Sequence, residues 1–228
     1  MKDMKDIIGV IFDFNGTMFF DSKKHLQAWT MYAEELIGRK LSKDEIEKHV
    51  KGKPGRYVVE HFLGYSISDE MFEQFTEEKE SIYRRLCSED KASLKLADGL
   101  ESFLDFLAEH NIPRTLATMA PLSNVMYYFE TFDLYRWFEP DKIVCHDKRL
   151  RDKPFPDLYL VACKLIDKDP SRCLVFEDSD IGIMAATNAG IKHVVAVTGD
   201  NKNLDVSEFD NINAVIKDFT QLNKELEL

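Results

Sequence analysis

Short apolar runs alternate with amphipathic helical patterns along most of this 228-residue chain, and this alternation strongly constrains the fold. Within each run the apolar residues are nearly continuous, as in parallel strands that helices cover on both faces. Strands joined by helices require right-handed crossovers and form a doubly wound sheet. The predicted strands are Ile7–Phe12, Arg114–Thr118, Lys142–Cys145, Cys173–Glu177, His193–Val197 and, with a weaker pattern, Ala214–Ile216.

The segments between these runs have the periodicity of helices. Leucine and phenylalanine side chains recur at helical spacing from Leu100 to Leu107, and Asn111 and Pro113 end that pattern. Further helices are predicted at about residues 156–166 and 180–189, the latter followed by Gly190, which suits a left-handed cap. The sequence therefore predicts an α/β fold with a doubly wound, mostly parallel, Rossmann-like sheet.

One region interrupts the alternation, because only helical patterns are found between about Asp21 and Lys91. The sequence from Ser42 to Glu45 is a capping box that opens one helix, and Ser68 suits the N-cap of another. An all-helical insert directly after the first strand indicates a separate cap domain. We therefore expect a core domain of residues 1–20 and 92–228, and a helical cap domain of residues 21–91.

Charge and composition exclude several classes of partner. The formal net charge of −11 argues against nucleic acid, since phosphate backbones need clustered Lys and Arg. No apolar run approaches the ~20 residues of a membrane span, and the N-terminus lacks the apolar stretch of a signal peptide. The four cysteines show no metal-ligand spacing and fit reduced thiols. We expect a cytoplasmic protein with no nucleic-acid or membrane partner; the oligomeric state stays open, with a monomer as the expectation.

Polar residues follow or lie close to the ends of four predicted strands. Ligands in open α/β sheets bind beyond these carboxyl ends, so the polar residues are expected to converge. Each one alone has a simpler explanation: threonines cap strand ends, charged runs form solvated loops, and acidic pairs favour helix N-termini. Together they suit a metal-bound phosphoryl group. The residues are Asp13, Thr118, Lys153, Glu177 and Asp178.

The chemistry of phosphoryl transfer suggests a role for each residue. A phosphoryl group repels an anionic nucleophile unless a cation such as Mg²⁺, held by one or two carboxylates and water, neutralises its charge. Asp13 could bind the metal and attack phosphorus, which gives an aspartyl-phosphate. Thr118 and Lys153 are expected to bind the phosphate. Asp178, with Glu177 beside it, would complete the metal shell.

The first strand ends in Phe12-Asp13-Phe14-Asn15-Gly16-Thr17, which resembles the DxDGT motif of the haloacid dehalogenase superfamily of phosphohydrolases. Thr118 is placed like the Ser/Thr motif of that superfamily. The segment from Lys153 to Tyr159 resembles its KPxPDxY segment, and the segment from Phe176 to Gly190 resembles its EDSxxGxxAAxxAG segment. With four motifs in order, the chain is identified as a member of this superfamily. Its helical insert resembles the cap of the β-phosphoglucomutase and phosphoglycolate phosphatase branch.

The resemblance extends to the cap. The segment from His25 to Trp29 is similar to the mutase cap segment whose His helps couple cap closure to acid/base positioning, and Lys51-Gly52 is similar to the substrate loop. The mutase Arg that grips the distal phosphate is replaced by Gly55, with Arg56 next to it. A half-buried structural role against Trp29 remains the alternative for His25. The resemblance implies substrate binding by Gly16, Thr17, His25, Lys51 and Arg56, and a Mg²⁺ site at Asp13, the backbone carbonyl of Asn15, Asp178 and Glu177.

Asn15 stands where the phosphatases and mutases of the superfamily carry the Asp that acts as general acid and base. An amide has no proton that titrates near neutral pH, so this side chain cannot perform that step. Positioned acid–base catalysis contributes about 10²–10⁴-fold to a rate. Three explanations stay open: a natural branch with weak or substrate-assisted turnover, a binding or regulatory protein without turnover, or an introduced Asp-to-Asn change.

The sequence thus predicts a Mg²⁺-dependent phosphatase acting on a small phosphorylated metabolite, a sugar phosphate. A β-phosphoglucomutase-like mutase is the alternative with the same fold. A catalytically silent protein that binds a phosphoester or a protein partner is the alternative of another class. The dehalogenase and phosphonatase branches fit less well. The former carry a bulkier aromatic residue at position 15 and the latter an Ala, with a cap Lys for which Lys51 or Lys53 could be offered.

Overall fold

The computed structural model describes residues 7–147, 149–199, 201 and 204–222. These residues form two compact units, which we call the helical unit and the sheet unit. The helical unit comprises Asp21–Lys95, and the sheet unit comprises the described residues on either side of it. No helix within the described ranges is long and apolar enough to cross a membrane. The four cysteines, all in described positions, are free, as expected.

The sheet unit contains a parallel sheet with β1 near its centre. Among the described residues the sheet has five strands in the order β2-β1-β3-β4-β5. Because β2 and β3 flank β1, the residues that follow these three strands meet at one edge of the sheet. The strands are β1 (Gly9–Phe12), β2 (Arg114–Leu116), β3 (Cys173–Glu177), β4 (His193–Val197) and β5 (Ile212–Ile216).

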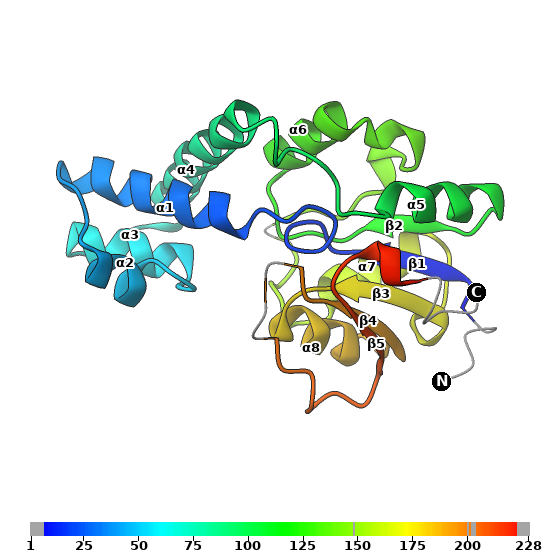
Figure 1. The fold of residues 1–228 in the computed structure, drawn as a ribbon. Helices are drawn as coiled ribbons and strands as arrows, with labels where there is room; N and C mark the ends of the chain where they lie inside the picture. The colour runs from blue at the N-terminus through cyan, green and yellow to red at the C-terminus, as the bar shows by residue number, and fades with distance from the viewer. Residues whose placement is uncertain (1–6, 148, 200, 202–203, 223–228) are drawn as a thin grey trace. The chain divides into compact units, whose positions relative to one another are not determined.

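Helices cover both faces of this sheet, as Figure 1 shows for α5 on one side and α8 on the other. On the α8 side, Ile11, Val175 and Val194 belong to a buried apolar cluster with residues of α7 and α8. The predicted doubly wound α/β fold is therefore confirmed. The helices of the sheet unit are α5 (Leu100–Glu109), α6 (Leu122–Phe132), α7 (Asp157–Leu165) and α8 (Asp180–Asn188), with short 3₁₀ turns at Leu134–Arg136, Pro140–Lys142, Pro170–Arg172 and Phe219–Gln221.

Aromatic rings fill the opposite face of the sheet. Phe12 of β1 stacks on Phe176 of β3 with ring centroids 5.0 Å apart. Phe103 of α5 meets Phe176 edge-on at 5.5 Å, and Phe219 lies against the same ring at 5.1 Å. Such pairs add to the stability that burial of the rings provides. This cluster fixes the strand ends that carry the polar residues predicted above.

The sequence predicts the central strands well and one outer strand wrongly. The runs Cys173–Glu177 and His193–Val197 coincide with β3 and β4. The strand predicted at 142–145 is absent from the described fold: Pro140–Lys142 forms a 3₁₀ turn, and only Val144 pairs, through a bridge to Ala117. This segment lies at the sheet edge, where the chain has a partner on one side only and leaves after a single bridge.

The helical unit consists, over its described length, of four helices. Ser42 forms the predicted capping box with Glu45, and the Ser68 side chain accepts a hydrogen bond from the Met71 backbone N–H. Both predicted helix starts are therefore confirmed. The helices are α1 (Ser22–Ile37), α2 (Lys43–His49), α3 (Gly55–Leu63) and α4 (Asp69–Glu89).

Two helices were not predicted from the sequence. The helix α3 begins at a glycine, which has low helix propensity. The sequence of α6 is rich in aromatic residues and has no side-chain cap at its start. Its buried residues include Tyr128 and Phe129, so packing against the rest of the sheet unit stabilises the helix where its local sequence does not.

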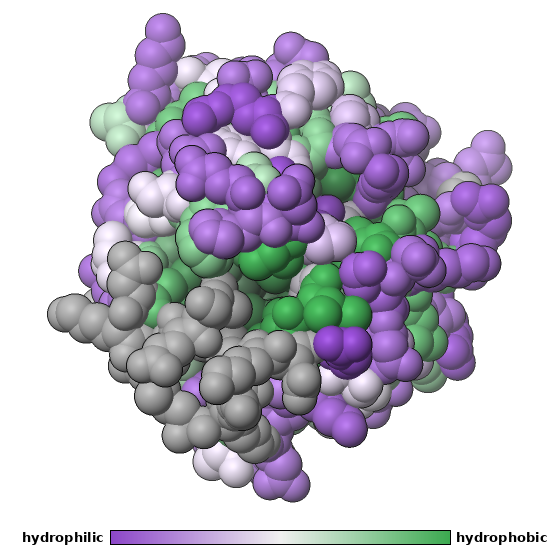
Figure 2. All heavy atoms as spheres, turned by 90° about the vertical axis from the view of Figure 1, so that its right-hand side faces the viewer, coloured by the Kyte–Doolittle hydropathy of each residue, from purple (hydrophilic) through white to green (hydrophobic). Residues whose placement is uncertain are grey.

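The strands begin on the right of Figure 1, and Figure 2 views the molecule from that side. Hydrophobic side chains are visible near the centre of this face, with hydrophilic ones around them. The candidate functional residues predicted in the sheet unit follow the opposite ends of the strands. The two ends of the sheet therefore differ in chemistry, and each is considered separately below.

We expect Phe176→Ala to destabilise the sheet unit by about 3–5 kcal/mol, because it leaves a cavity among packed rings. Phe155→Ala is the matched control: its ring is 49% exposed, and its loss should cost less than about 1 kcal/mol. Urea unfolding followed by circular dichroism measures both. Equal losses in the two variants would contradict the proposed importance of the aromatic cluster.

Candidate active site at the carboxyl ends of the strands

Three neighbouring strands bring the predicted residues to one edge of the sheet. The backbone N–H of Asp13 donates to the carbonyl oxygen of Phe176 at 3.0 Å, which places the residue after β1 beside the end of β3. On the other side, the N–H of Ala117 donates to the carbonyl of Phe12 at 2.9 Å. Asp13 therefore lies between the segment that carries Thr118 and the segment that carries Glu177 and Asp178.

Lys153 is buried between two carboxylates. Its Nζ lies 2.7 Å from Asp13 Oδ1 and 2.5 Å from Glu177 Oε1, and its side chain is only 4% exposed. Burial alone would lower the pKa of Lys153, but the charges of Asp13 and Glu177 raise it well above its usual range. The ammonium group therefore stays charged and holds the Asp13 carboxylate in one orientation.

Glu177 is surrounded by donors. Its Oε1 accepts from the Tyr159 hydroxyl at 3.0 Å, in addition to Lys153. Its Oε2 accepts from the backbone N–H groups of Asp178 and Ser179 and from the Ser179 hydroxyl at 2.9–3.0 Å. Burial and the nearby Glu177 charge raise the pKa of Tyr159, so the phenol remains a donor. This geometry suits Glu177 to positioning Lys153.

Two glycines make room for these carboxylates. A Cβ atom on Gly182 would lie 1.8 Å from Glu177 Oε1, and one on Gly16 would lie 2.1 Å from Asp178 Oδ2. Gly16 also has φ of +80°, a conformation that disfavours other residues. The glycine of the first motif therefore lets the Asp178 carboxylate approach the turn that follows Asp13. The Asp178 carbonyl is itself fixed, since it accepts from Asn201 Nδ2 at 3.1 Å.

The side chain of Asn15 is held by an aromatic residue of α6. Its Nδ2 donates to the Tyr128 hydroxyl at 2.8 Å. The ring of Tyr128 is buried and stacks on Phe14 with centroids 4.1 Å apart. The amide is thus oriented by a partner 113 residues away along the chain.

Thr17 and Thr118 are both buried. The Thr118 hydroxyl accepts from the backbone N–H of Ala120 at 3.1 Å, which leaves its own proton available to donate. Thr17 is fully buried, and its hydroxyl has no hydrogen-bond partner within the described residues. The structure therefore brings Thr118 to the same edge as Asp13, whereas Thr17 lies within the turn that supports Asp13.

The remaining predicted residues belong to the helical unit. His25 stacks on Tyr83 with ring centroids 4.0 Å apart, and its Nδ1 lies 3.1 Å from the buried ammonium of Lys79. Its Nε2 lies 3.3 Å from an Asp21 carboxylate oxygen. His25 is thus a member of a partly buried polar cluster in its own unit. The Nζ of Lys79 also lies 4.9 Å from the indole centroid of Trp29, the residue against which the alternative reading placed His25.

Lys51 and Arg56 differ in how they are held. Lys51 pairs with Glu47, four residues earlier in the chain, and is largely exposed. Arg56 pairs with Asp69 at 2.5 Å, donates to the carbonyl of Ile67 at 2.9 Å and stacks on Phe72. Arg56 therefore joins α3 to the start of α4, whereas Lys51 is presented at an exposed turn.

Few side chains at this edge of the sheet could ligate a metal. Within the described parts of the chain, no group of three or more His, Cys, Asp or Glu side chains could hold a metal ion. Two carboxylates and a backbone carbonyl are nevertheless a donor set that suits Mg²⁺, which keeps several of its waters. Asp13, Asp178 and the carbonyl of Asn15 are the groups of this type at the edge of the sheet.

Sequence reasoning missed several residues that complete this arrangement. Tyr159 belongs to the Lys153–Tyr159 segment, so its position there was a usable signal. Ser179 follows Glu177-Asp178 and caps α8, a role that its residue type predicts. Tyr128 gave no signal, because its contact with Asn15 joins distant parts of the chain.

Comparison with known proteins places this arrangement in a family. A family model described as haloacid dehalogenase-like hydrolase matches residues 10–196. The chain is 28% identical over 188 residues to the phosphorylated carbohydrates phosphatase of Thermotoga maritima, with 82% of this chain and 84% of the relative covered.

Solved structures agree with this result. The structure of a HAD hydrolase, family IA, variant 3, from Entamoeba histolytica superposes with a TM-score of 0.86 at 34% identity, with 94% of this chain and 95% of that chain covered. A putative β-phosphoglucomutase from Thermotoga maritima gives a TM-score of 0.71 at 27% identity, with 96% and 98% covered. Since the family model spans most of the sequence, the chain belongs to the haloacid dehalogenase-like hydrolases.

Proposed function

We propose that this protein is a phosphatase of a small phosphorylated carbohydrate and that Asp13 is its nucleophile. The observation that carries the proposal is the buried ammonium of Lys153, which bridges Asp13 and Glu177 at the ends of β1 and β3. A cation held there can stabilise both an anionic nucleophile and a phosphoryl group. The similarity to a phosphatase named for phosphorylated carbohydrates supports the choice of substrate.

In the first step, an oxygen of the Asp13 carboxylate attacks phosphorus. A bond forms between this oxygen and phosphorus, the bond from phosphorus to the sugar oxygen breaks, and the sugar oxygen takes a proton. Lys153 orients the carboxylate, and the Thr118 hydroxyl donates to a phosphoryl oxygen. In the second step, water attacks the aspartyl-phosphate, which releases phosphate and restores the Asp13 carboxylate.

We assign the metal site to Asp13, Asp178 and the backbone carbonyl of Asn15. When bound, Mg²⁺ supplies positive charge that offsets the repulsion between the nucleophile and the phosphoryl group. The close approach of Asp178 to Gly16 supports this choice, because it brings the carboxylate to the turn that carries Asn15. Glu177 is assigned to holding Lys153 and not to the metal, since its oxygens accept from five donors.

Asn15 limits both steps. Its amide cannot give a proton to the sugar oxygen or take one from water, so protons pass to and from solvent or the substrate itself. The hydrogen bond to Tyr128 keeps the amide in a defined position. We therefore expect slow turnover, least slow for substrates with good leaving groups.

The helical unit is proposed to act as the cap that recognises the carbohydrate. His25 and Lys51 are assigned to substrate contacts, as their sequence context implies. Arg56 is assigned to support of α3 and α4, because its guanidinium is engaged by Asp69, Ile67 and Phe72. Closure of such a cap would exclude water from the reacting groups.

A phosphosugar mutase is the second candidate, and similarity to the putative β-phosphoglucomutase structure favours it. It would convert glucose 1-phosphate only in the presence of a bisphosphate primer. A protein that binds a phosphoester without turnover is the third candidate, and Asn15 favours it.

We expect Asp13→Asn to abolish hydrolysis of an activated aryl phosphate and of sugar phosphates in the presence of Mg²⁺. Asn15→Asp should raise kcat for sugar phosphates by about 10²–10⁴-fold, because it restores a positioned acid and base. The gain should be smaller for the aryl phosphate, whose leaving group needs less protonation. The turnover of the parent protein and of the two variants is measured by the release of inorganic phosphate.

The results separate the candidates. Turnover by the parent protein that disappears in Asp13→Asn supports the phosphatase. No turnover by the parent, with a large gain in Asn15→Asp, supports the silent binding protein. Activity that survives Asp13→Asn unchanged would show that the proposed nucleophile is wrong, and primer-dependent conversion of glucose 1-phosphate would identify a mutase.

Glu177→Gln should lower the free energy of unfolding by about 2–4 kcal/mol, because it removes one of the two charges that compensate the buried Lys153. Turnover should fall as well, since Lys153 loses the group that orients it. Ser179→Ala removes the hydrogen bond from a neutral hydroxyl to the same carboxylate, and with it the N-cap of α8, and should cost about 1–2 kcal/mol. Calorimetry measures the stability of both variants, and phosphate release measures their turnover. Equal losses in Glu177→Gln and Ser179→Ala would contradict the positioning role of the Glu177 charge.

A further inference from the structure

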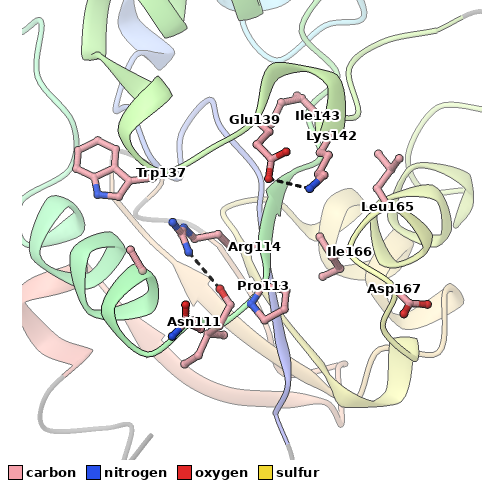
Figure 3. Close-up of a pocket in the computed structure, with 12 residues that line it drawn as sticks. Asn111, Pro113, Arg114, Trp137, Glu139, Lys142, Ile143, Leu165, Ile166 and Asp167 are labelled. Carbon is pink, nitrogen blue, oxygen red and sulfur yellow. Dashed lines mark hydrogen bonds and ion pairs between the residues drawn. The ribbon is translucent and has the colours of Figure 1, made fainter.

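A second pocket lies at the end of the sheet where the strands begin, away from Asp13. It has a volume of about 520 Å³, within the range of small-molecule sites. Its walls come from the turn before β2, the segment after α6 and the end of α7 (Figure 3). The lining residues are Ala108, Asn111, Ile112, Pro113, Arg114, Trp137, Glu139, Lys142, Ile143, Leu165, Ile166 and Asp167.

Arg114 and Lys142 are the two basic residues among the lining residues, and the charge of Arg114 is not compensated by a described carboxylate. Its Nη1 donates to the carbonyl of Ile112 at 3.2 Å, but its Nε is buried with no hydrogen-bond partner among the described residues. No ion pair within 4.0 Å joins it to an acidic side chain in those parts of the chain. Burial lowers the pKa of Arg114, yet a guanidinium stays protonated in proteins. An uncompensated, partly buried charge is costly, so an anion here would be bound favourably.

The other charged residues of the pocket leave Arg114 unneutralised. Glu139 pairs with Lys142 at 2.7 Å, which cancels both charges. Figure 3 shows Asp167 on the far side of Pro113 from the Arg114 guanidinium. The part of the pocket next to Arg114 is therefore electropositive.

Trp137 provides an aromatic surface in the same pocket as Arg114. Trp137 is buried, and its indole N–H donates to Asp105 Oδ1 at 2.7 Å, which fixes the ring. Arg136 stacks on the same ring at 4.2 Å but is paired with Glu101 and Asp105 and does not line the pocket. Isoleucine and leucine side chains complete the apolar surface.

We propose that this pocket binds a small organic oxyanion, a carboxylate or phosphate whose oxygens pair with Arg114 and whose apolar body packs against Trp137. A guanidinium presents a planar fork of donors that matches such head groups. The apolar lining accounts for the body of the ligand. The pocket is separate from the candidate active site, so the proposal does not depend on the activity of Asp13.

The chain has two tryptophans, so Trp29→Phe leaves Trp137 as a fluorescent reporter of this pocket. Phenylacetate and phenylphosphonate serve as probes, and phenylacetamide is the neutral control of the same shape. We expect saturable changes in Trp137 fluorescence with one or both acids and none with the amide. Binding by both acids supports a general oxyanion site, and binding by one identifies the head group.

Arg114→Met, placed in the same background, should weaken binding by about 10-fold or more, as loss of a charge-assisted hydrogen bond predicts. Arg136→Met is the matched control, because Arg136 stacks on the Trp137 indole but does not line the pocket. This variant should bind the probes as tightly as the parent. Circular dichroism confirms that each variant is folded.

Several outcomes would overturn the proposal. They are no saturable change up to about 10 mM probe, equal binding of phenylacetamide and phenylacetate, or undiminished binding by Arg114→Met. The comparison of acid with amide uses no Arg114 variant. It therefore decides the question even if Arg114→Met does not fold.

Discussion

The buried ammonium of Lys153 is the interaction on which the candidate site depends. A charge with 4% exposure is stable only when opposite charges and hydrogen bonds compensate its loss of water. Asp13 and Glu177 provide that compensation, and Glu177 is in turn held by Tyr159 and by the start of α8. The ends of β1 and β3, the loop before α7 and the N-terminus of α8 thus meet at one cation. This network would hold Asp13, the proposed nucleophile, in position before any substrate arrives.

The same network explains what could be predicted from the sequence. The strands β3 and β4 were predicted at their observed bounds because strands buried on both faces are continuous apolar runs. The residues after β1, β2 and β3 could be placed together because parallel strands share a carboxyl edge. The segment at 142–145 was misjudged because a strand needs hydrogen-bonding partners, and a residue pattern alone does not reveal that only Val144 has one. The contact between Asn15 and Tyr128 depends on tertiary structure and has no local signature.

Asn15 and Tyr128 show how a change at one position is accommodated. A carboxylate at position 15 would be an acceptor for the Tyr128 hydroxyl, whereas the amide Nδ2 donates to it. Tyr128 suits either arrangement, since its hydroxyl can donate and accept. The stacking of Tyr128 on Phe14 is independent of this choice. Position 15 can therefore hold Asp or Asn with little structural cost, and the two residues differ there in whether the side chain can carry a proton.

The two ends of the sheet are joined through β2. Arg114 begins this strand in the second pocket, and Thr118 follows its far end beside Asp13. Hydrogen bonds from Ala117 to Phe12 and from Thr118 to Val144 hold the connecting segment between its neighbours. A ligand that fixes Arg114 would therefore contact the first residue of the strand that leads to Thr118, a proposed phosphate-binding residue. If such binding changes the affinity for phosphate, linkage requires that phosphate change the affinity of the second pocket by the same factor.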